Sequence, residues 1–369
     1  MIHKVIVADR DLTVLEELTN EISNLRWEYN RIGGCGAFSF DIPRRLYEDL
    51  TLGGNFNIKI SRRNPSTGDF DLWYQGRIED KDYNVSGNEE KISVRGMGYQ
   101  SELSDIYIDA DFSSQEISVV VKNLLDNYIV PNTNITYDSG DITATTFTAD
   151  TLEFNTDALS AMQTLADITG TREWGVDKNR KFFFKVRSST VGFRYNLPSK
   201  VLKIDISMSS KEIVNRVIVT GGDVAGSPFG ATYNDTASQL KWKRRDKSIQ
   251  NSAIVTSAVA SQFADAIFAE FNDIVKRARI NLLDERQIES TIPIPLFQVL
   301  VSQIKYGEKK YGTFLYSGLV SYQVNRIQYD LDDDGNLTIS MQVGQLRPSI
   351  SENISQLSHQ IEQLRQQGV

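Results

Sequence analysis

The sequence predicts a mainly β, α+β protein in which two strand-rich blocks are separated by a module with helices. Two observations lead to this fold class. Residues 1–105 and 199–347 consist largely of short alternating or apolar segments bounded by turn residues, which is typical of β-strands. Residues 106–198 and the chain end, 348–369, carry apolar side chains at helical three- and four-residue steps. We therefore expect four parts with these boundaries, the last being a C-terminal helix.

The first block contains short, clearly bounded strands. Pro43 ends one of them, because proline cannot donate a ladder hydrogen bond. Turn residues at 64–69 and 86–88 separate others. The predicted strands are Val5–Val7, Gly36–Pro43, Ile58–Arg63, Phe70–Arg77 and Glu90–Gly98.

The middle module combines two helices with a hairpin. Ser113 and Glu116 have the spacing of a capping box, which predicts a helix from there to just before Pro131. A second helix is expected over Thr156–Thr169, with Gly170 as its C-terminal stop. After it, a turn over Asp177–Arg180 joins two apolar segments, Trp174–Val176 and Phe182–Phe184.

The second block is interrupted by one long predicted helix, Ser252–Lys276, with an apolar face of which Phe263 and Ile274 are members. The expected strands are Val217–Thr220, Phe297–Ile304, Tyr311–Tyr329 and Leu337–Val343. In the C-terminal part, apolar residues step by four and three, which indicates about two heptads of a coiled-coil seam. These residues are Ile350, Ile354, Leu357, Ile361 and Leu364.

A strand–turn–strand unit occurs twice. The first copy has Tyr74-Gln75-Gly76, a turn at Gly87-Asn88 and a strand beginning Ile92-Ser93. The second has Tyr316-Ser317-Gly318, a turn at Gly335-Asn336 and a strand beginning Ile339-Ser340. Any two β-hairpins share some features, so chance similarity is the alternative. Because each unit closes a β-rich block of similar size, we interpret the pair as a duplication.

Composition argues against several function classes. The 369 residues include one cysteine, Cys35, and two histidines, His3 and His359, at opposite ends of the chain. No disulfide, Cys/His metal site or His-dependent catalytic site is therefore expected. A net charge of −8 disfavours a nucleic-acid reader. Since no apolar segment has the length of a signal peptide or a membrane span, we expect synthesis in a cytoplasm.

No catalytic, cofactor-binding or metal-binding residue is predicted. Asp330–Gly335 matches the start of a calcium-binding loop, but Met341 stands where the bidentate glutamate belongs, so an acidic turn is favoured. Gly221–Gly226 lacks dinucleotide-binding spacing. The acidic pairs Glu79-Asp80 and Glu89-Glu90 are expected by chance among 48 acidic residues. Lys241–Arg245 could bind phosphate or a glycan, although a solvated loop or a contact with an acidic subunit is favoured.

The order of segments resembles the hub proteins of bacteriophage tails, including the hub part of tail-associated lysins. Three stretches carry the resemblance. Gly36–Pro43 is similar to an early Phe-containing strand of that family, Phe70–Tyr99 to its hairpin, and Asp157–Phe184 to its Leu-rich helix and hairpin.

The resemblance implies a homotrimer in which each chain contributes two tube-like β-barrel domains, so that three chains continue a sixfold tail tube. Implied partners are a distal tail or tail-tube ring protein, the tape measure protein and a distal spike or fibre protein. Phage DNA would pass through without specific binding, and the site would be the virion tail tip or baseplate. The alternatives are the hub of a phage-derived contractile injection system and, from a different class, a glycan-binding or cell-wall-degrading β-protein.

Overall fold

The computed structural model describes most of the chain between residues 3 and 344. The described residues are 3–18, 21–43, 56–64, 66–86, 89–145, 147–169, 172–186, 191–196, 201–224, 226–250, 254, 256–282, 296–301, 305–306, 309–310, 318–332 and 337–344. The predicted C-terminal helix and its heptads lie outside them. No described helix is both long and apolar enough to cross a membrane.

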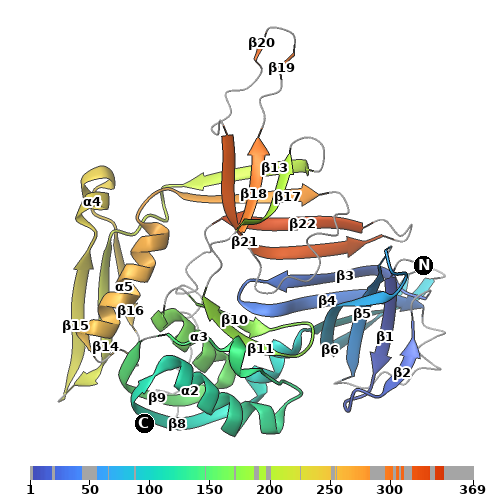
Figure 1. Ribbon diagram of the computed structural model, residues 1–369, viewed down its shortest axis with the longest axis horizontal. Coiled ribbons are helices and arrows are strands. Elements are labelled where there is room, and N and C mark those ends of the chain that lie inside the picture. The colour runs from blue at the N-terminus through green and yellow to red at the C-terminus, as the bar shows by residue number, and fades with distance from the viewer. Residues whose placement is uncertain are drawn as a thin grey trace.

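One large sheet of 15 strands runs across the molecule (Figure 1). Its main path is β13-β17-β22-β21-β3-β4-β7-β6-β5-β1-β2, and β12 with β18, and β10 with β11, join it from the side. The bounds are β1 (His3–Ala8), β2 (Val14–Glu17), β3 (Ser23–Asn30), β4 (Gly33–Pro43), β5 (Asn57–Arg63), β6 (Phe70–Ser86), β7 (Glu89–Met97), β10 (Arg172–Val176), β11 (Phe182–Val186), β12 (Val191–Asn196), β13 (Val201–Ser209), β17 (Val275–Leu282), β18 (Leu296–Val301), β21 (Gly318–Leu331) and β22 (Leu337–Gly344).

Smaller sheets and the helices are attached to this frame. Figure 1 shows the three-stranded sheet with α5 at one end and the helical module beside the large sheet. The remaining strands are β8 (Tyr107–Glu116), β9 (Thr148–Asp157), β14 (Arg216–Val224), β15 (Ser227–Asn234), β16 (Asp246–Gln250), β19 (Lys305–Tyr306) and β20 (Lys309–Lys310). The α-helices are α2 (Ile117–Leu124), α3 (Ala158–Thr169), α4 (Thr236–Trp242) and α5 (Ser257–Phe271), and the short helical turns are η1 (Tyr99–Asp105), η2 (Leu125–Ile129), η3 (Val130–Asn132) and η4 (Ser139–Asp141).

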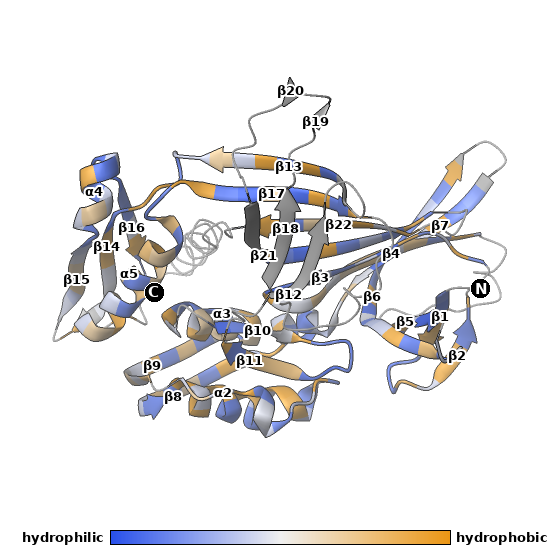
Figure 2. Cartoon of the chain, turned by 45° about the horizontal axis from the view of Figure 1, so that its top comes forward, coloured by the Kyte–Doolittle hydropathy of each residue, from blue (hydrophilic) through white to orange (hydrophobic). Residues whose placement is uncertain are grey.

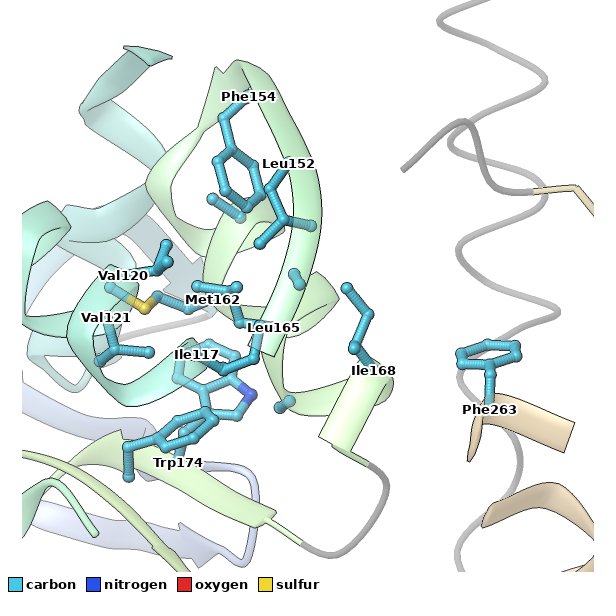
Figure 3. Close-up of a cluster of buried hydrophobic side chains, with 14 of the residues drawn as sticks. Ile117, Val120, Val121, Leu152, Phe154, Met162, Leu165, Ile168, Trp174 and Phe263 are labelled. Carbon is cyan, nitrogen blue, oxygen red and sulfur yellow. The ribbon is translucent and has the colours of Figure 1, made fainter. Parts of the chain in front are cut away.

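Two hydrophobic cores are formed by the described residues. The first lies in the large sheet and joins residues from both β blocks; in it Trp27 stacks on Tyr329 with ring centroids 5.1 Å apart. The second is built around α2, α3 and β10 (Figure 3) and continues to α5. There Met162 and Leu165 of α3 are buried beside Val121 of α2 and Trp174 of β10. A mainly β, α+β fold is thereby confirmed.

In the middle module the hairpin β10–β11 was predicted correctly, and the second helix, α3, begins two residues later than predicted, at Ala158. Its expected stop, Gly170, lies outside the described residues, and the strands β8 and β9 were not predicted. The hairpin β10–β11 has its turn where expected, since Asp177 N–H donates to Lys181 O (2.9 Å) and Arg180 N–H to Asp177 O (3.0 Å). The capping box was wrong. Ser113 lies within β8, and α2 begins only at Ile117, because the Glu116 carboxylate accepts hydrogen bonds from Ser118 and Thr145.

The long predicted helix was also wrong at both ends. It begins at Ser257, where the Thr256 hydroxyl caps it, and it ends at Phe271. Asp273 then accepts a hydrogen bond from the N–H of Ile274 (2.7 Å), and Val275 opens β17. Pairing of β17 between β13 and β22 outweighs the helical pattern there.

Candidate assembly interface

The large sheet contains one six-strand plan twice. In the first copy the strands are arranged β1-β5-β6-β7-β4-β3, and in the second β12-β18-β21-β22-β17-β13. If the strands of each copy are numbered in chain order, strands with the same number hold the same position in the six-strand plan. The copies differ in that β12 pairs parallel to β18, whereas β1 pairs antiparallel to β5. In addition, β2 pairs with β1 in the first copy, and no described strand corresponds to it in the second. The middle module is inserted between the copies, and β14 to α5 are inserted within the second.

The register of the two hairpins supports a duplication. Tyr83 of β6 lies opposite Ile92 of β7, and Tyr329 of β21 lies opposite Ile339 of β22. Counting back from the tyrosine, each long strand has a bulge at the same place, between Ile78 and Asp80 in β6 and between Val324 and Arg326 in β21. A bulge is a specific feature of a strand pair, so its recurrence in register argues against chance similarity.

A cross-strand hydrogen bond recurs as well. In the first copy Ser93 of β7 donates to Asp41 of β4 (2.6 Å). At the equivalent positions of the second copy, Ser340 of β22 donates to Asn281 of β17 (3.3 Å). The Ile-Ser part of the sequence repeat is thus structurally equivalent. The Tyr-x-Gly part is not, because Gly318 begins β21 further from the bulge than Gly76 lies from the bulge of β6. Both hairpin turns, and Tyr316, lie outside the described residues.

The two copies meet inside the chain where β3 pairs antiparallel with the second half of β21. On one face Trp27 lies directly opposite Tyr329, and both are buried. On the other face two ion pairs cross the junction, Arg26 with Asp330 and Glu28 with Arg326. The junction therefore combines aromatic packing with charge complementarity, as stable strand pairs do.

A buried charged cluster connects this junction to the middle module. Arg31, between β3 and β4, lies 3.4 Å from Glu173 of β10 and 3.8 Å from Glu270 of α5. The Arg31 and Glu173 side chains are almost completely buried. Nearby on α3, burial raises the pKa of Asp167 to about 7, the Glu270 charge adds to this, and a hydrogen bond from Gln163 (2.7 Å) opposes it. Through Arg31 the cluster links the large sheet to β10 and α5.

The residues weighed for chemistry do not come together. Cys35 is buried, and burial raises the pKa of its thiol well above the usual range. His3 is buried against Trp27 and Trp73. No group of three or more metal-ligating side chains occurs among the residues described above, and residues 333–335 of the acidic Asp330–Gly335 turn fall outside them.

Two of the four cationic side chains in the basic segment Lys241–Arg245 form ion pairs within the chain. Lys241 lies 2.7 Å from Asp273, and Arg244 forks onto Asp246 with bonds of 2.7 and 2.6 Å. Its arrangement fits a solvated surface better than an anion site.

Sequence reasoning missed β3, which forms the junction with β21, and β13, which holds the equivalent position in the second copy. A signal existed for β13, since Ile204, Ile206 and Met208 alternate with Lys203, Asp205 and Ser207. The partner of β3, by contrast, could be identified only in the folded chain.

Comparison with known proteins defines the fold class. No protein-family model and no curated protein sequence matches the chain. Solved structures do match over nearly its full length. A tail protein from Neisseria meningitidis MC58 has a TM-score of 0.63 at 12% identity, covering 95% of this chain and 98% of its own. The 43 kDa tail protein of prophage MuSo2 from Shewanella oneidensis has 0.60 at 15%, covering 94% and 99%. Prophage tail protein gp18 from Listeria monocytogenes EGD-e has 0.60 at 12%, covering 97% and 99%.

The chain therefore has the fold of phage tail proteins, which confirms the resemblance inferred from its segments. At these identities the likeness establishes the fold, and the role of this chain has to be argued from its own duplicated sheet.

Proposed function

We propose that the chain is a structural hub subunit of a bacteriophage tail tip or baseplate. The observation that carries the proposal is the doubled six-strand plan in a chain with a phage tail-protein fold. A tube of sixfold symmetry can be continued by three chains only if each chain supplies two similar units. The units proposed are the β-domains of residues 1–105 and 199–347, as tube-like barrel domains, with residues 106–198 as the module between them. One strand of that module, β12 (Val191–Asn196), completes the six-strand plan of the second unit.

In this proposal three chains form a ring that lines or closes the DNA channel. The net charge of −8 supports a lumen that repels phosphates, so DNA passes without specific binding. One face of the ring meets a distal tail or tail-tube ring protein and the tape measure protein, and the other meets a spike or fibre protein. The hub role itself needs no catalytic residue.

Mass photometry of the purified chain tests the proposal. The expected particle has a mass of about 125 kDa, three times the chain mass of 41.6 kDa. A particle that stays at the mass of one chain at micromolar concentration, and at the higher concentrations accessible to light scattering, contradicts it. Zymography on peptidoglycan tests the rival class: lysis that a single carboxylate substitution abolishes would replace the structural role with an enzymatic one.

A further inference from the structure

The two hairpins differ in what lies beside them. The second half of β21 has β22 on one side and β3 on the other. The equivalent half of β6, from Asp80 to Ser86, pairs with β7, and no other described strand pairs with it. The strands β3 and β13, which hold equivalent positions in the two copies, also differ in their neighbours. β3 lies between β4 and β21, whereas its counterpart β13 pairs with β17 and ends the described sheet.

The side chains on these strands are buried where the strand has two neighbours and exposed where it has one. At the junction within the chain Trp27 and Tyr29 of β3 have exposed fractions of 0% and 2%. Their counterparts on β13, Ile206 and Met208, are exposed by 38% and 40%. On β6, Val85 is exposed by 67%, while its counterpart Leu331 is packed against the core. Figure 2 shows β13 as the outermost strand of the sheet, with the β6–β7 hairpin projecting at the far side.

We propose that β13 of one copy of this chain pairs antiparallel with residues Asp80–Ser86 of β6 in the next copy, repeating between chains the β3–β21 junction seen within one chain. The binding partner of both strand edges, β13 and the second half of β6, is thus a second copy of this chain. The inference rests on the proposed function, because a ring of such copies is what the hub role requires. It adds the strands and the register through which the copies meet.

The register follows from the internal junction. Within the chain Trp27 lies opposite Tyr329, so between chains Ile206 is expected opposite Tyr83. Likewise Leu25 lies opposite Leu331 within the chain, so Ile204 is expected opposite Val85 between chains. Arg26 lies opposite Asp330 within the chain, and the equivalent pair between chains is Asp205 opposite Asn84. In this register Tyr83 and Val85 meet isoleucines on one face, and Lys81 lies opposite Met208 on the same face. No two like charges stand directly opposite each other.

Charge also prevents the strands from exchanging partners. If β13 took the place of β3 on β21, Asp205 would lie opposite Asp330. If β3 took the place of β13 on β6, Glu28 would lie opposite Asp82. Like charges directly opposed destabilise a strand pair, so each edge discriminates against the wrong partner. Each chain offers one edge of each kind, so copies join head to tail, and such contacts close into a ring when the rotation permits.

Cysteine cross-linking between two single variants tests the junction. Asn84→Cys and Asp205→Cys lie opposite each other in the proposed register, at a separation that a disulfide can bridge. The native Cys35 is buried and present in both. After mixing and mild oxidation with diamide, we expect a covalent species of about 83 kDa, twice the chain mass of 41.6 kDa. A single chain cannot give this product, because the two cysteines are on different chains.

The matched control shifts the register. Asn84→Cys mixed with Ser209→Cys places the cysteines several residues apart, so we expect at least about fivefold less cross-linked product. The double variant Asn84→Cys/Asp205→Cys should give covalent species up to a trimer. Val85→Glu, at an exposed position, should leave circular dichroism unchanged and shift the assembly to single chains.

The outcomes separate the junction from the hub role. A trimer by mass photometry with no register-specific cross-link overturns the junction and leaves the proposed function standing. A chain that stays single and forms no cross-link overturns both. Register-specific cross-linking that continues beyond three chains supports the junction and contradicts a closed ring of three.

Discussion

The hairpins β6–β7 and β21–β22 share a register and a bulge, yet their outer edges have different environments. Tyr329 is completely buried beneath Trp27, whereas Tyr83 at the same position of the first hairpin is exposed by 60%. The backbone plan is the same, so the difference arises from β3, which lies beside β21, whereas no described strand lies beside the equivalent half of β6. A duplicated unit thus gives one contact that stabilises the fold and a matching surface suited to assembly.

The contact between the large sheet and the middle module differs from the β3–β21 junction in the burial of its charges. Burial of Arg31 with Glu173 places charges out of water, whereas the ion pair of Arg26 with Asp330 stays at the surface. Removing one partner of a buried pair leaves the other charge in a low-dielectric site. The two arginines, five residues apart in sequence, therefore allow a direct comparison of buried and exposed charge.

The largest effect is expected from Arg31→Met. Since Glu173 stays buried without the Arg31 guanidinium, the substitution should destabilise the chain by about 3–5 kcal/mol. Arg26→Met is the matched control and should cost less than about 1 kcal/mol, because its side chain is 57% exposed. Guanidinium denaturation monitored by tryptophan fluorescence measures both. Equal effects would show that the buried cluster does not hold the module to the sheet.

A second comparison uses the covered and the exposed positions of the two junction strands. Trp27→Ala removes a buried ring and should destabilise the chain by about 3–5 kcal/mol. Ile206→Ala changes the equivalent position on β13, where the side chain is partly exposed, and should cost less than about 1 kcal/mol in a single chain. The measurement is denaturation at low protein concentration. A large loss with Ile206→Ala under those conditions would mean that β13 is already covered within one chain.

The charged cluster also predicts a pH dependence. Burial raises the pKa of Asp167 to about 7, so the folded chain holds a proton that the unfolded chain releases at a lower pH. Its contribution to stability is complete below the ordinary aspartate range and is lost as the pH rises towards and through 7. Since the residue is partly exposed, we expect a loss of about 1–2 kcal/mol. Asp167→Asn should remove this slope in melting temperatures measured between pH 4 and 8.

Gln163→Leu sharpens the same test. Its amide donates to the Asp167 carboxylate and favours the charged form, so its removal should steepen the decline. A slope that is unchanged in both variants would contradict the assigned pKa.

Local patterns were sufficient for elements whose partners are close in sequence. The hairpin β10–β11 and the inward face of α3 were predicted because turn residues and helical periodicity are properties of a short segment. Where local and distant preferences compete, prediction failed. The helical pattern continues past Phe271, but residues from Val275 onward gain strand partners on both sides, and only the fold supplies them.

The interface could be predicted only in part. The repeated Ile-Ser strands pointed to a duplication, and Ile92 and Ile339 are equivalent in the structure. The contact between the copies could not be found this way, because β3 and β21 are separated by almost the whole chain and their pairing leaves no periodic signal. The roles of Trp27, Arg26 and Glu28 in the junction can be recognised only in the folded chain, where β21 lies beside them.

The smallest predicted effect compares the recurring serines of the two copies. Ser93 donates to the carboxylate of Asp41, while Ser340 donates to the neutral amide of Asn281. Burial opposes ionisation of Asp41, but hydrogen bonds from Ser93, Lys91 and Asn24 outweigh it and hold its pKa below the ordinary value. Ser93→Ala should therefore cost about 1.5 kcal/mol at pH 7, and Ser340→Ala about 0.5–1 kcal/mol.

The pH dependence distinguishes the two serines. A lowered pKa stabilises the folded chain above the ordinary aspartate range, and this stability is lost as the pH falls through the folded value. The effect of Ser93→Ala should shrink between pH 7 and pH 3, while that of Ser340→Ala stays constant, as measured by denaturation midpoints at several pH values. If both effects shrink equally, the difference between the copies does not lie in the charge of the acceptor, and the two hydrogen bonds serve only to keep the shared register.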